Sequence, residues 1–211
     1  MLFDLDGTLV DTAPDLGHAA NLVRESLRME PLPLEGYRPV ASAGARGLLG
    51  KALGITPAHE DFPRHRDRFL ELYRANLSRQ SRLFEGMEQM LRLMEDRGIR
   101  WGVVTNKPAW LTGPLMQDLA LAQRAAVSIS GDEVPKPKPA PDSLLKACEL
   151  LGLDPADCIY VGDDRRDIEA GRAAGMRTLA AAWGYEGEHA IHSWQADSIV
   201  QTPADLRGWL D

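Results

Sequence analysis

Two aspartates, Asp4 and Asp6, stand two residues apart directly after a short apolar run at the start of the chain. In a β-strand, residues i and i+2 project to the same face, so both carboxylates would point to one place. Like charges this close need a cation or a proton between them. Such a pair suits a hard metal ion such as Mg²⁺ and chemistry on a phosphate group. A strand that simply ends in an Asp-Gly turn is the alternative, and the longer string D-L-D-G-T-L favours the functional interpretation.

Three more polar clusters each follow an apolar run that is typical of a strand. They are Thr105-Asn106, the Lys/Pro alternation at 134–141 with Lys136 and Lys138, and Asp163-Asp164 with Asp167. Taken singly, each has an ordinary alternative: an Asx turn, a stiff linker, or a helix cap. In an open parallel sheet, however, ligands bind beyond the carboxyl ends of the strands. Four clusters at four strand ends therefore predict a phosphate site.

The elements that must position these clusters alternate from residue 84 onward. Helical spacing predicts helices near 87–97, 109–120, 142–151 and 167–174, several of them closed by glycine. Apolar runs predict strands near 99–104, 126–130, 158–162, 177–183 and 197–201. This alternation predicts an α/β fold, with a parallel sheet covered on both faces.

The segment between the first strand and residue 84 has a helical pattern only. A first helix should begin at Thr12 as the N-cap, with Pro14 in its first turn and Asp15 at the capping-box position. Further helices are expected near 45–53 and 66–77, and no strand is expected between about 14 and 82. We therefore expect a core made of residues 1–13 and 83–211, with residues 14–82 as a helical insert.

Composition limits the possible partners. The chain has 211 residues, 44% of them hydrophobic, and a net charge of −7, which argues against nucleic acid or an anionic membrane as a partner. Neither a signal peptide nor a membrane-spanning run is evident, so a cytoplasmic protein is expected. Cys148 and Cys158 lie within apolar patterns and should be buried free thiols. The histidines lack zinc-site spacing.

The four clusters resemble, in order, the motifs of the haloacid dehalogenase superfamily. The matching strings are D-L-D-G-T-L-V-D-T, V-V-T-N-K-P, K-P-A-P-D and V-G-D-D-R-R-D-I-E-A-G-R-A-A-G-M. Within that superfamily the chain is similar to the phosphoglycolate phosphatase-like branch, and S-A-G-A-R also resembles the bacterial N-acetylmuramic acid 6-phosphate phosphatases. The resemblance implies a Rossmann-like core with an inserted α-helical cap domain.

The resemblance also implies roles for individual residues. Asp4 would be the nucleophile that forms an aspartyl-phosphate, and Asp6 would be the general acid and then the base. Mg²⁺ would be held by the Asp4 side chain, the Asp6 backbone carbonyl and Asp163. Asp167 would support this metal site from outside or bind through water. Thr105 and Asn106 would hold the phosphoryl oxygens, and Lys138, rather than Lys136, would neutralise charge.

The expected activity is Mg²⁺-dependent hydrolysis of a small phosphate ester by a monomer or homodimer. Two substrates are in play, 2-phosphoglycolate and N-acetylmuramic acid 6-phosphate, and resemblance favours the second. A phosphomutase of the same superfamily and a non-catalytic phosphate-binding regulator are the alternatives. A dehalogenase is disfavoured because Asp6 supplies the acid and base that phosphoryl transfer needs.

Some residues carry weaker expectations. Arg46, in the insert, either contacts the substrate or is a solvated helix residue. The surrounding glycine-rich stretch lacks the order of a P-loop, because Ala52 follows Lys51. His18 and Lys107 are expected to be structural or exposed. Only three residues precede Asp4, so the first strand should be unusually short unless the start is misassigned.

Overall fold

A six-stranded, fully parallel sheet forms the centre of one lobe in the computed structural model, which describes residues 1–185, 187 and 190–210. The strand order is β5 (Ser128–Ile129), β4 (Gly102–Val104), β1 (Leu2–Phe3), β6 (Ile159–Gly162), β7 (Arg177–Ala181) and β8 (Ser198–Val200). The predicted α/β class with a parallel sheet is confirmed. Most strands are shorter than expected, and β1, the shortest of the central ones, lies between β4 and β6.

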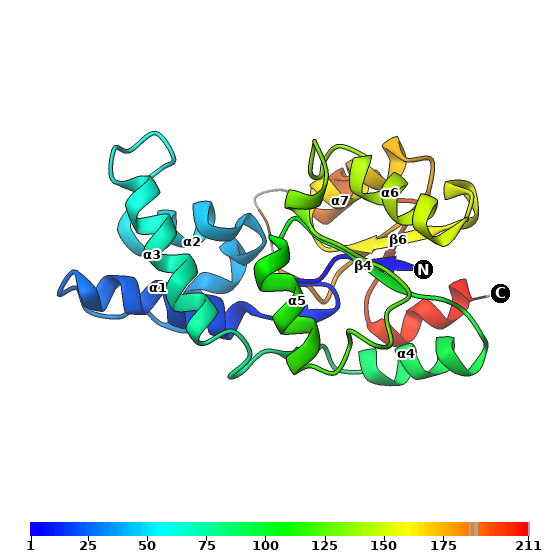
Figure 1. The fold of residues 1–211 in the computed structure, drawn as a ribbon, viewed down its shortest axis with the longest axis horizontal. Helices are drawn as coiled ribbons and strands as arrows, with labels where there is room; N and C mark the ends of the chain where they lie inside the picture. The colour runs from blue at the N-terminus through cyan, green and yellow to red at the C-terminus, as the bar shows by residue number, and fades with distance from the viewer. Residues whose placement is uncertain (186, 188–189, 211) are drawn as a thin grey trace.

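Successive residues of each strand feed two separate cores on opposite faces of the sheet. Phe3, Val103 and Val161 lie side by side and pack toward α4 (Met87–Asp96), α5 (Ala109–Asp118) and the 3₁₀ segment η5 (Pro203–Trp209). Leu2 and Tyr160 face the other way, toward α6 (Asp142–Leu151) and α7 (Arg165–Ala173). Figure 1 shows α6 and α7 on one side of the sheet and α4 on the other.

Helices from the first third of the chain form the second lobe, at the left of Figure 1. They are α1 (Ala13–Ser26), the 3₁₀ segment η1 (Leu34–Ala43), α2 (Gly44–Leu53) and α3 (Phe62–Ala75). The three α-helices occur close to the predicted positions. The 3₁₀ segment was not predicted, because Pro31 and Pro33 interrupt the helical spacing before it. The boundaries of the insert at 14 and 82 stay a prediction.

The two chain segments that connect the lobes pair with each other. β2 (Val10–Asp11) runs antiparallel to β3 (Arg82–Leu83) as a separate two-stranded ribbon. No strand was expected between about 14 and 82, and β3 begins at the upper limit of that range. Two residues are too few to give an alternating pattern, and the pairing spans more than seventy positions.

The start of α1 also corrects an expectation. Thr12 is the N-cap residue by position, but its hydroxyl donates to Asp6 Oδ1 (2.6 Å) and makes no capping bond. Asp15 does not complete a capping box either. Its buried carboxylate accepts hydrogen bonds from the Gln80 and Ser81 backbone N–H groups and from the Ser81 hydroxyl, at 2.7–3.0 Å. Tertiary partners have replaced the local ones, and they tie α1 to the returning chain.

Short 3₁₀ turns complete the described chain: η2 (Gly131–Glu133), η3 (Pro155–Asp157) and η4 (Ile191–Ser193). Cys148 and Cys158 are buried free thiols, as predicted. Among the described residues, no helix combines the length and the apolar character that crossing a membrane requires.

Replacing Asp15 with alanine should destabilise the protein strongly. The substitution removes the acceptor that three donors share and leaves the buried N–H and hydroxyl groups of Ser81 without this partner, at a cost of about 3 kcal/mol in unfolding free energy. Chemical denaturation measures this difference. Asp67→Ala is the control, because that exposed carboxylate only pairs with its neighbour Arg66 and should change stability by no more than about 0.5 kcal/mol. Equal effects of the two substitutions would contradict the assignment.

Candidate active site

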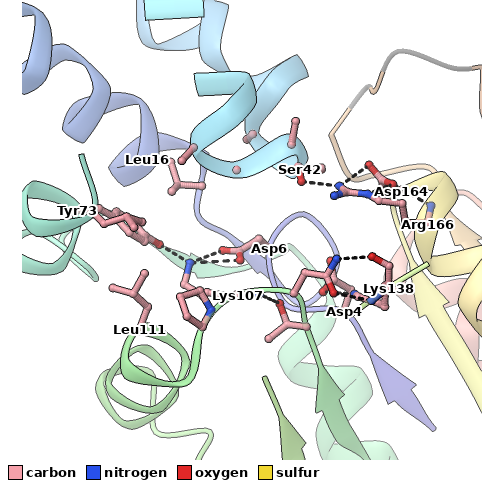
Figure 2. A pocket seen from close by; sticks show the side chains of 18 of the residues that line it. Asp4, Asp6, Leu16, Ser42, Tyr73, Lys107, Leu111, Lys138, Asp164 and Arg166 are labelled. Atoms are coloured by element: carbon pink, nitrogen blue, oxygen red, sulfur yellow. Dashed lines mark hydrogen bonds and ion pairs between the residues drawn. The ribbon is translucent and has the colours of Figure 1, made fainter. Parts of the chain in front are cut away.

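The predicted clusters meet in one pocket at the carboxyl ends of the strands. Asp4 follows β1, Thr105 follows β4, Asp163 follows β6, and Lys138 lies on the loop after η2. Figure 2 shows Asp4 and Lys138 side by side in the pocket. The pocket has a volume of about 310 Å³ and lies between the sheet and the helical lobe. Its lining includes Asp4, Asp6, Thr105, Asn106, Lys138, Asp164 and Asp167. Residues more than 150 positions apart are thus brought together, as the topology of a parallel sheet requires.

Lys138 is the cation at the centre of this arrangement. Its ammonium group lies 2.8 Å from Asp4 Oδ1 and 2.7 Å from Asp167 Oδ1, and it also donates to the Tyr160 hydroxyl and the Val104 carbonyl. Burial alone would lower the pKa of Lys138, but Asp167 and Asp4 outweigh it, so the pKa is raised. Lys138 therefore stays charged. Lys136 is exposed, and the role assigned to Lys138 stays a prediction.

Asn106 fixes the loop that carries this lysine. Its amide nitrogen donates to the Lys138 carbonyl (2.8 Å), and its amide oxygen accepts the Lys138 backbone N–H (2.9 Å). The Thr105 hydroxyl is buried and accepts the Lys107 backbone N–H at 3.2 Å. Asn106 thus has a positioning task that the sequence did not reveal, in addition to its place in the pocket lining.

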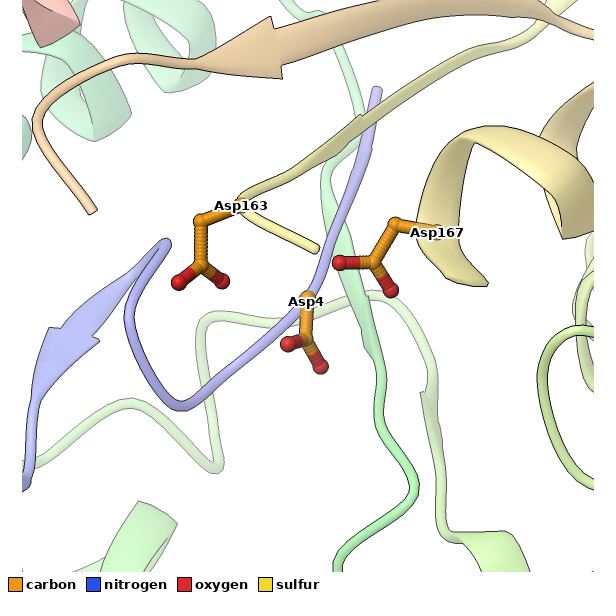
Figure 3. Close-up of side chains that lie close together, drawn as sticks. All are labelled: Asp4, Asp163 and Asp167. Atoms are coloured by element: carbon orange, nitrogen blue, oxygen red, sulfur yellow. The ribbon is translucent and has the colours of Figure 1, made fainter. Parts of the chain in front are cut away.

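Three buried carboxylates, those of Asp4, Asp163 and Asp167, offer oxygens that all lie within 4.8 Å of one another (Figure 3). Burial raises the pKa of Asp4 to about 6, with Lys138 opposing this shift and Asp167 adding to it. Burial, Asp4 and Asp167 likewise raise the pKa of Asp163 well above its usual range. Crowded carboxylates of this kind fit a hard divalent cation, which would relieve their repulsion.

The contacts of Asp167 distinguish it from Asp4. One oxygen faces Lys138, and the other accepts the Asp164 backbone N–H at 3.0 Å. Asp4, in contrast, uses only Oδ1 for Lys138, and no described residue donates a hydrogen bond to its Oδ2. Asp4 therefore keeps one oxygen open toward the pocket, whereas both oxygens of Asp167 hold surrounding groups in place.

Gly7 explains why glycine follows the aspartate pair. Its φ is +92°, and a Cβ atom at this position would lie 2.1 Å from Asp163 Oδ2. Only glycine permits both the backbone conformation and the approach of Asp163. The turn therefore brings the first motif against the last.

Asp163 is oriented by three donors from distant parts of the chain. Thr8 Oγ1 donates to its Oδ1 (2.9 Å), while Ser42 Oγ and the Tyr185 backbone N–H donate to its Oδ2 (both 3.0 Å). Ser42 belongs to η1 of the helical lobe. Sequence reasoning missed Ser42 and Tyr185, because neither lies in a motif that indicates contact with an acidic residue.

Asp6 turns its side chain away from the acidic cluster. It accepts hydrogen bonds from Thr12 Oγ1 (2.6 Å) and from the Lys107 ammonium group, at 3.0 and 3.2 Å to its two oxygens. Lys107 was expected to be structural or exposed. It is 8% exposed and forms an ion pair with a predicted catalytic residue, so it is not an exposed lysine, and the structural alternative is the one that its contacts fit. The only signal was its position directly after Thr105-Asn106.

Arg166 joins the two lobes beside the pocket. Its guanidinium pairs with both oxygens of Asp164 (2.8 and 3.0 Å) and donates to the Ser42 carbonyl at 2.7 Å. Arg46 is exposed and borders a neighbouring hollow of about 760 Å³, together with Lys51 and Arg165. The outer wall of the pocket itself is apolar and aromatic, and it contains Leu16, Phe69, Leu70, Tyr73 and Leu111.

Comparison with known proteins gives consistent similarities. Residues 1–181 match the family model described as haloacid dehalogenase-like hydrolase. The chain is 42% identical to an N-acetylmuramic acid 6-phosphate phosphatase of Pseudomonas putida, over all of this chain and 95% of that protein. It is 43% identical to a phosphoglycolate phosphatase of Xanthomonas campestris, over 98% of this chain and 93% of that protein.

A solved structure agrees with this similarity. The crystal structure of a Haemophilus somnus protein, described as a predicted phosphoglycolate phosphatase, superimposes with a TM-score of 0.86. The two chains are 26% identical, and the match covers all of this chain and 96% of the other. The predicted resemblance and the predicted fold are therefore both confirmed.

Removing one carboxylate from the acidic cluster should weaken binding of Mg²⁺. Asp163→Asn keeps the size of the side chain but loses its charge, and we expect at least about a tenfold loss of Mg²⁺ affinity in isothermal titration calorimetry. Asp157→Asn changes an exposed carboxylate on η3 and should leave the affinity unchanged. Wild-type affinity in Asp163→Asn would exclude this cluster as the cation site.

Proposed function

The chain belongs to the haloacid dehalogenase-like hydrolase family and is a phosphatase, and on this basis we propose that it hydrolyses a small-molecule phosphate monoester through a phosphorylated Asp4. The observation that carries this proposal is the state of Asp4. One oxygen is held by Lys138, the other receives no hydrogen bond from a described residue, and the side chain lines the pocket. An anchored carboxylate with one free oxygen is suited to in-line attack on phosphorus.

In the first step, Asp4 Oδ2 attacks the phosphorus atom and the bond to the leaving oxygen breaks. Asp6 gives its proton to that oxygen, so the product leaves as an alcohol. Lys138 neutralises the transferring phosphoryl group, while Thr105 and Asn106 line the same part of the pocket and hold its oxygens.

In the second step, a water molecule attacks the phosphorus of the aspartyl-phosphate. Its proton passes to Asp6, the bond between phosphorus and Asp4 breaks, and phosphate and the free carboxylate are released. Mg²⁺, bound by Asp4, Asp163 and the Asp6 backbone carbonyl, would neutralise charge on the phosphoryl oxygens. Asp167 would hold Lys138 and the backbone at Asp164 in position next to this site.

The pocket supports a substrate larger than 2-phosphoglycolate. Its volume of about 310 Å³ is that of a site for a medium-sized ligand, and its outer wall is apolar and aromatic. A bare glycolate would leave this wall uncovered, whereas a sugar with acetamido and lactyl groups has methyl groups to place against it. N-acetylmuramic acid 6-phosphate, the compound named for the Pseudomonas relative, is therefore the proposed substrate.

Residues 14–82 act in this proposal as a cap that closes over the pocket. Leu16, Phe69, Leu70 and Tyr73 come from this segment and face the region where a leaving group would lie. Closure would exclude bulk water during chemistry. Arg46 borders the adjoining hollow, so we assign it to a distal part of the substrate rather than to the phosphoryl group.

Replacing the nucleophile should abolish turnover without unfolding the protein. Asp4→Asn keeps the shape of the side chain but removes the attacking charge, so hydrolysis of p-nitrophenyl phosphate should fall by at least about 10³-fold. Asp157→Asn is the matched control and should retain full activity. Near-normal turnover by Asp4→Asn, with melting behaviour like that of the wild type, would exclude the covalent mechanism.

A phosphate-release screen tests the substrate. With Mg²⁺ present, we expect kcat/KM for N-acetylmuramic acid 6-phosphate to exceed that for 2-phosphoglycolate by at least about tenfold, because only the larger compound covers the apolar wall. Hexose phosphates and nucleotides complete the panel. A preference for 2-phosphoglycolate would overturn the substrate assignment. Isomerisation of a hexose phosphate without phosphate release would favour a mutase, and binding without turnover would favour a regulator.

A further inference from the structure

Lys107 and Tyr73 form a buried contact between the two lobes that ends on Asp6. The Lys107 ammonium group donates to both oxygens of Asp6 and, at 2.9 Å, to the hydroxyl of Tyr73 (Figure 2). The same nitrogen lies 4.5 Å from the centre of the Tyr73 ring. Lys107 follows β4, whereas Tyr73 lies on α3 of the helical lobe and is 1% exposed.

The cost of burying this lysine indicates that the contact has a specific task. A buried ammonium group is unfavourable unless it is paired and hydrogen-bonded. The Lys107 side chain is only 5% exposed, and its hydrogen bonds go to Asp6 and Tyr73. Burial also raises the pKa of Tyr73 well above its usual range, so the phenol keeps its proton and accepts the Lys107 N–H. The tyrosine therefore holds the lysine, and the lysine holds the aspartate.

The contacts of Asp6 fit its proposed role as a base in the second step better than its role as an acid in the first. Lys107 and Thr12 both donate to Asp6, so the group is fixed as an acceptor on both oxygens. In the hydrolytic step of the proposed mechanism, Asp6 must accept a proton from water. Restricting rotation of the carboxylate keeps an accepting lone pair aimed into the pocket during that step.

We propose that Lys107 and Tyr73 are positioning residues for Asp6, which acts as the base when water hydrolyses the aspartyl-phosphate. Because Tyr73 lies on α3, the alignment of Asp6 then depends on the position of that helix. The inference rests on the proposed function. In the step concerned, water oxygen bonds to phosphorus, its proton goes to Asp6, and the bond between phosphorus and Asp4 breaks. Lys107 takes no part in this proton transfer and holds the Asp6 side chain in place by its hydrogen bonds.

The proposal predicts a particular split of kinetic constants. In a two-step mechanism, kcat/KM reports the steps through release of the alcohol, whereas kcat also contains hydrolysis of the intermediate. Lys107→Met should therefore lower kcat for p-nitrophenyl phosphate by about 30-fold, within the range of general-base effects, and leave kcat/KM within about twofold. Rapid mixing should show a burst of one p-nitrophenol per enzyme, followed by slow turnover.

Tyr73→Phe provides a milder second variant. It keeps the ring that stacks with Phe69 at a centroid separation of 6.2 Å and removes only the hydroxyl group. It should lower kcat by about threefold to tenfold, again with little change in kcat/KM. Lys136→Met, an exposed lysine, and Tyr37→Phe, a buried tyrosine bonded to Asn21 in the helical lobe, are the matched controls and should have normal kinetics.

The outcomes separate this inference from the proposed function. A parallel fall of kcat and kcat/KM in Lys107→Met and Tyr73→Phe, or no change in either variant, would overturn the positioning role while the wild type still turned over. If Lys107→Met failed to fold, Tyr73→Phe would decide alone. A wild-type enzyme that released no phosphate through Asp4 would instead refute the proposed function.

Discussion

One buried ammonium group, that of Lys138, lies against two of three buried carboxylates, and much of the fold serves to bring these four side chains together. Their formal charges sum to −2. Because the groups are buried and close together, neither water nor separation weakens the repulsion between the carboxylates. Burial, with a further contribution from the neighbouring carboxylates, raises the pKa values of Asp4 and Asp163. A divalent cation would restore neutrality, and this charge arrangement is a reason, besides the proposed chemistry, to place Mg²⁺ at this cluster.

The parallel sheet makes such crowding possible. β1 has only two residues, yet it lies between β4 and β6, and backbone hydrogen bonds continue on both sides of it. The Asp4 N–H donates to the Val161 carbonyl, and the Gly102 N–H donates to the Met1 carbonyl. Asp4 is therefore held as rigidly as a strand residue although it lies just past the strand. A longer strand is not needed, because the neighbouring strands fix its end.

The strand-end clusters were predictable because each depends on local pattern. Apolar runs predict strands, the alternation with helices predicts a parallel sheet, and such a sheet gathers its carboxyl ends at one edge. Asp4, Lys138 and Asp163 follow from this reasoning. Their geometry bears out the expected gathering, while the roles assigned to them remain predictions.

The contacts that could not be predicted join residues far apart with no local signal. Asp15 satisfies the capping-box pattern, yet its carboxylate binds the chain 65 positions later. Lys107 donates a hydrogen bond to Tyr73, which lies 34 positions earlier, and Ser42 donates one to Asp163, which lies 121 positions later. Local rules treat such residues as caps or solvated groups. Tertiary partners override those rules because a buried charge or polar group must be satisfied wherever the fold places it.

The helical lobe therefore contributes to the chemistry as well as to the wall of the pocket. Tyr73 lies four residues after Phe69 and three residues after Leu70, so one side of α3 carries all three of them. Two of these side chains border the region of the leaving group, and the third holds the lysine that contacts Asp6. A change in α3 that accommodates another substrate would also shift Tyr73 relative to Lys107. In the proposed mechanism, substrate choice and alignment of the acid and base would be linked through one helix, and variation on α3 should alter both together.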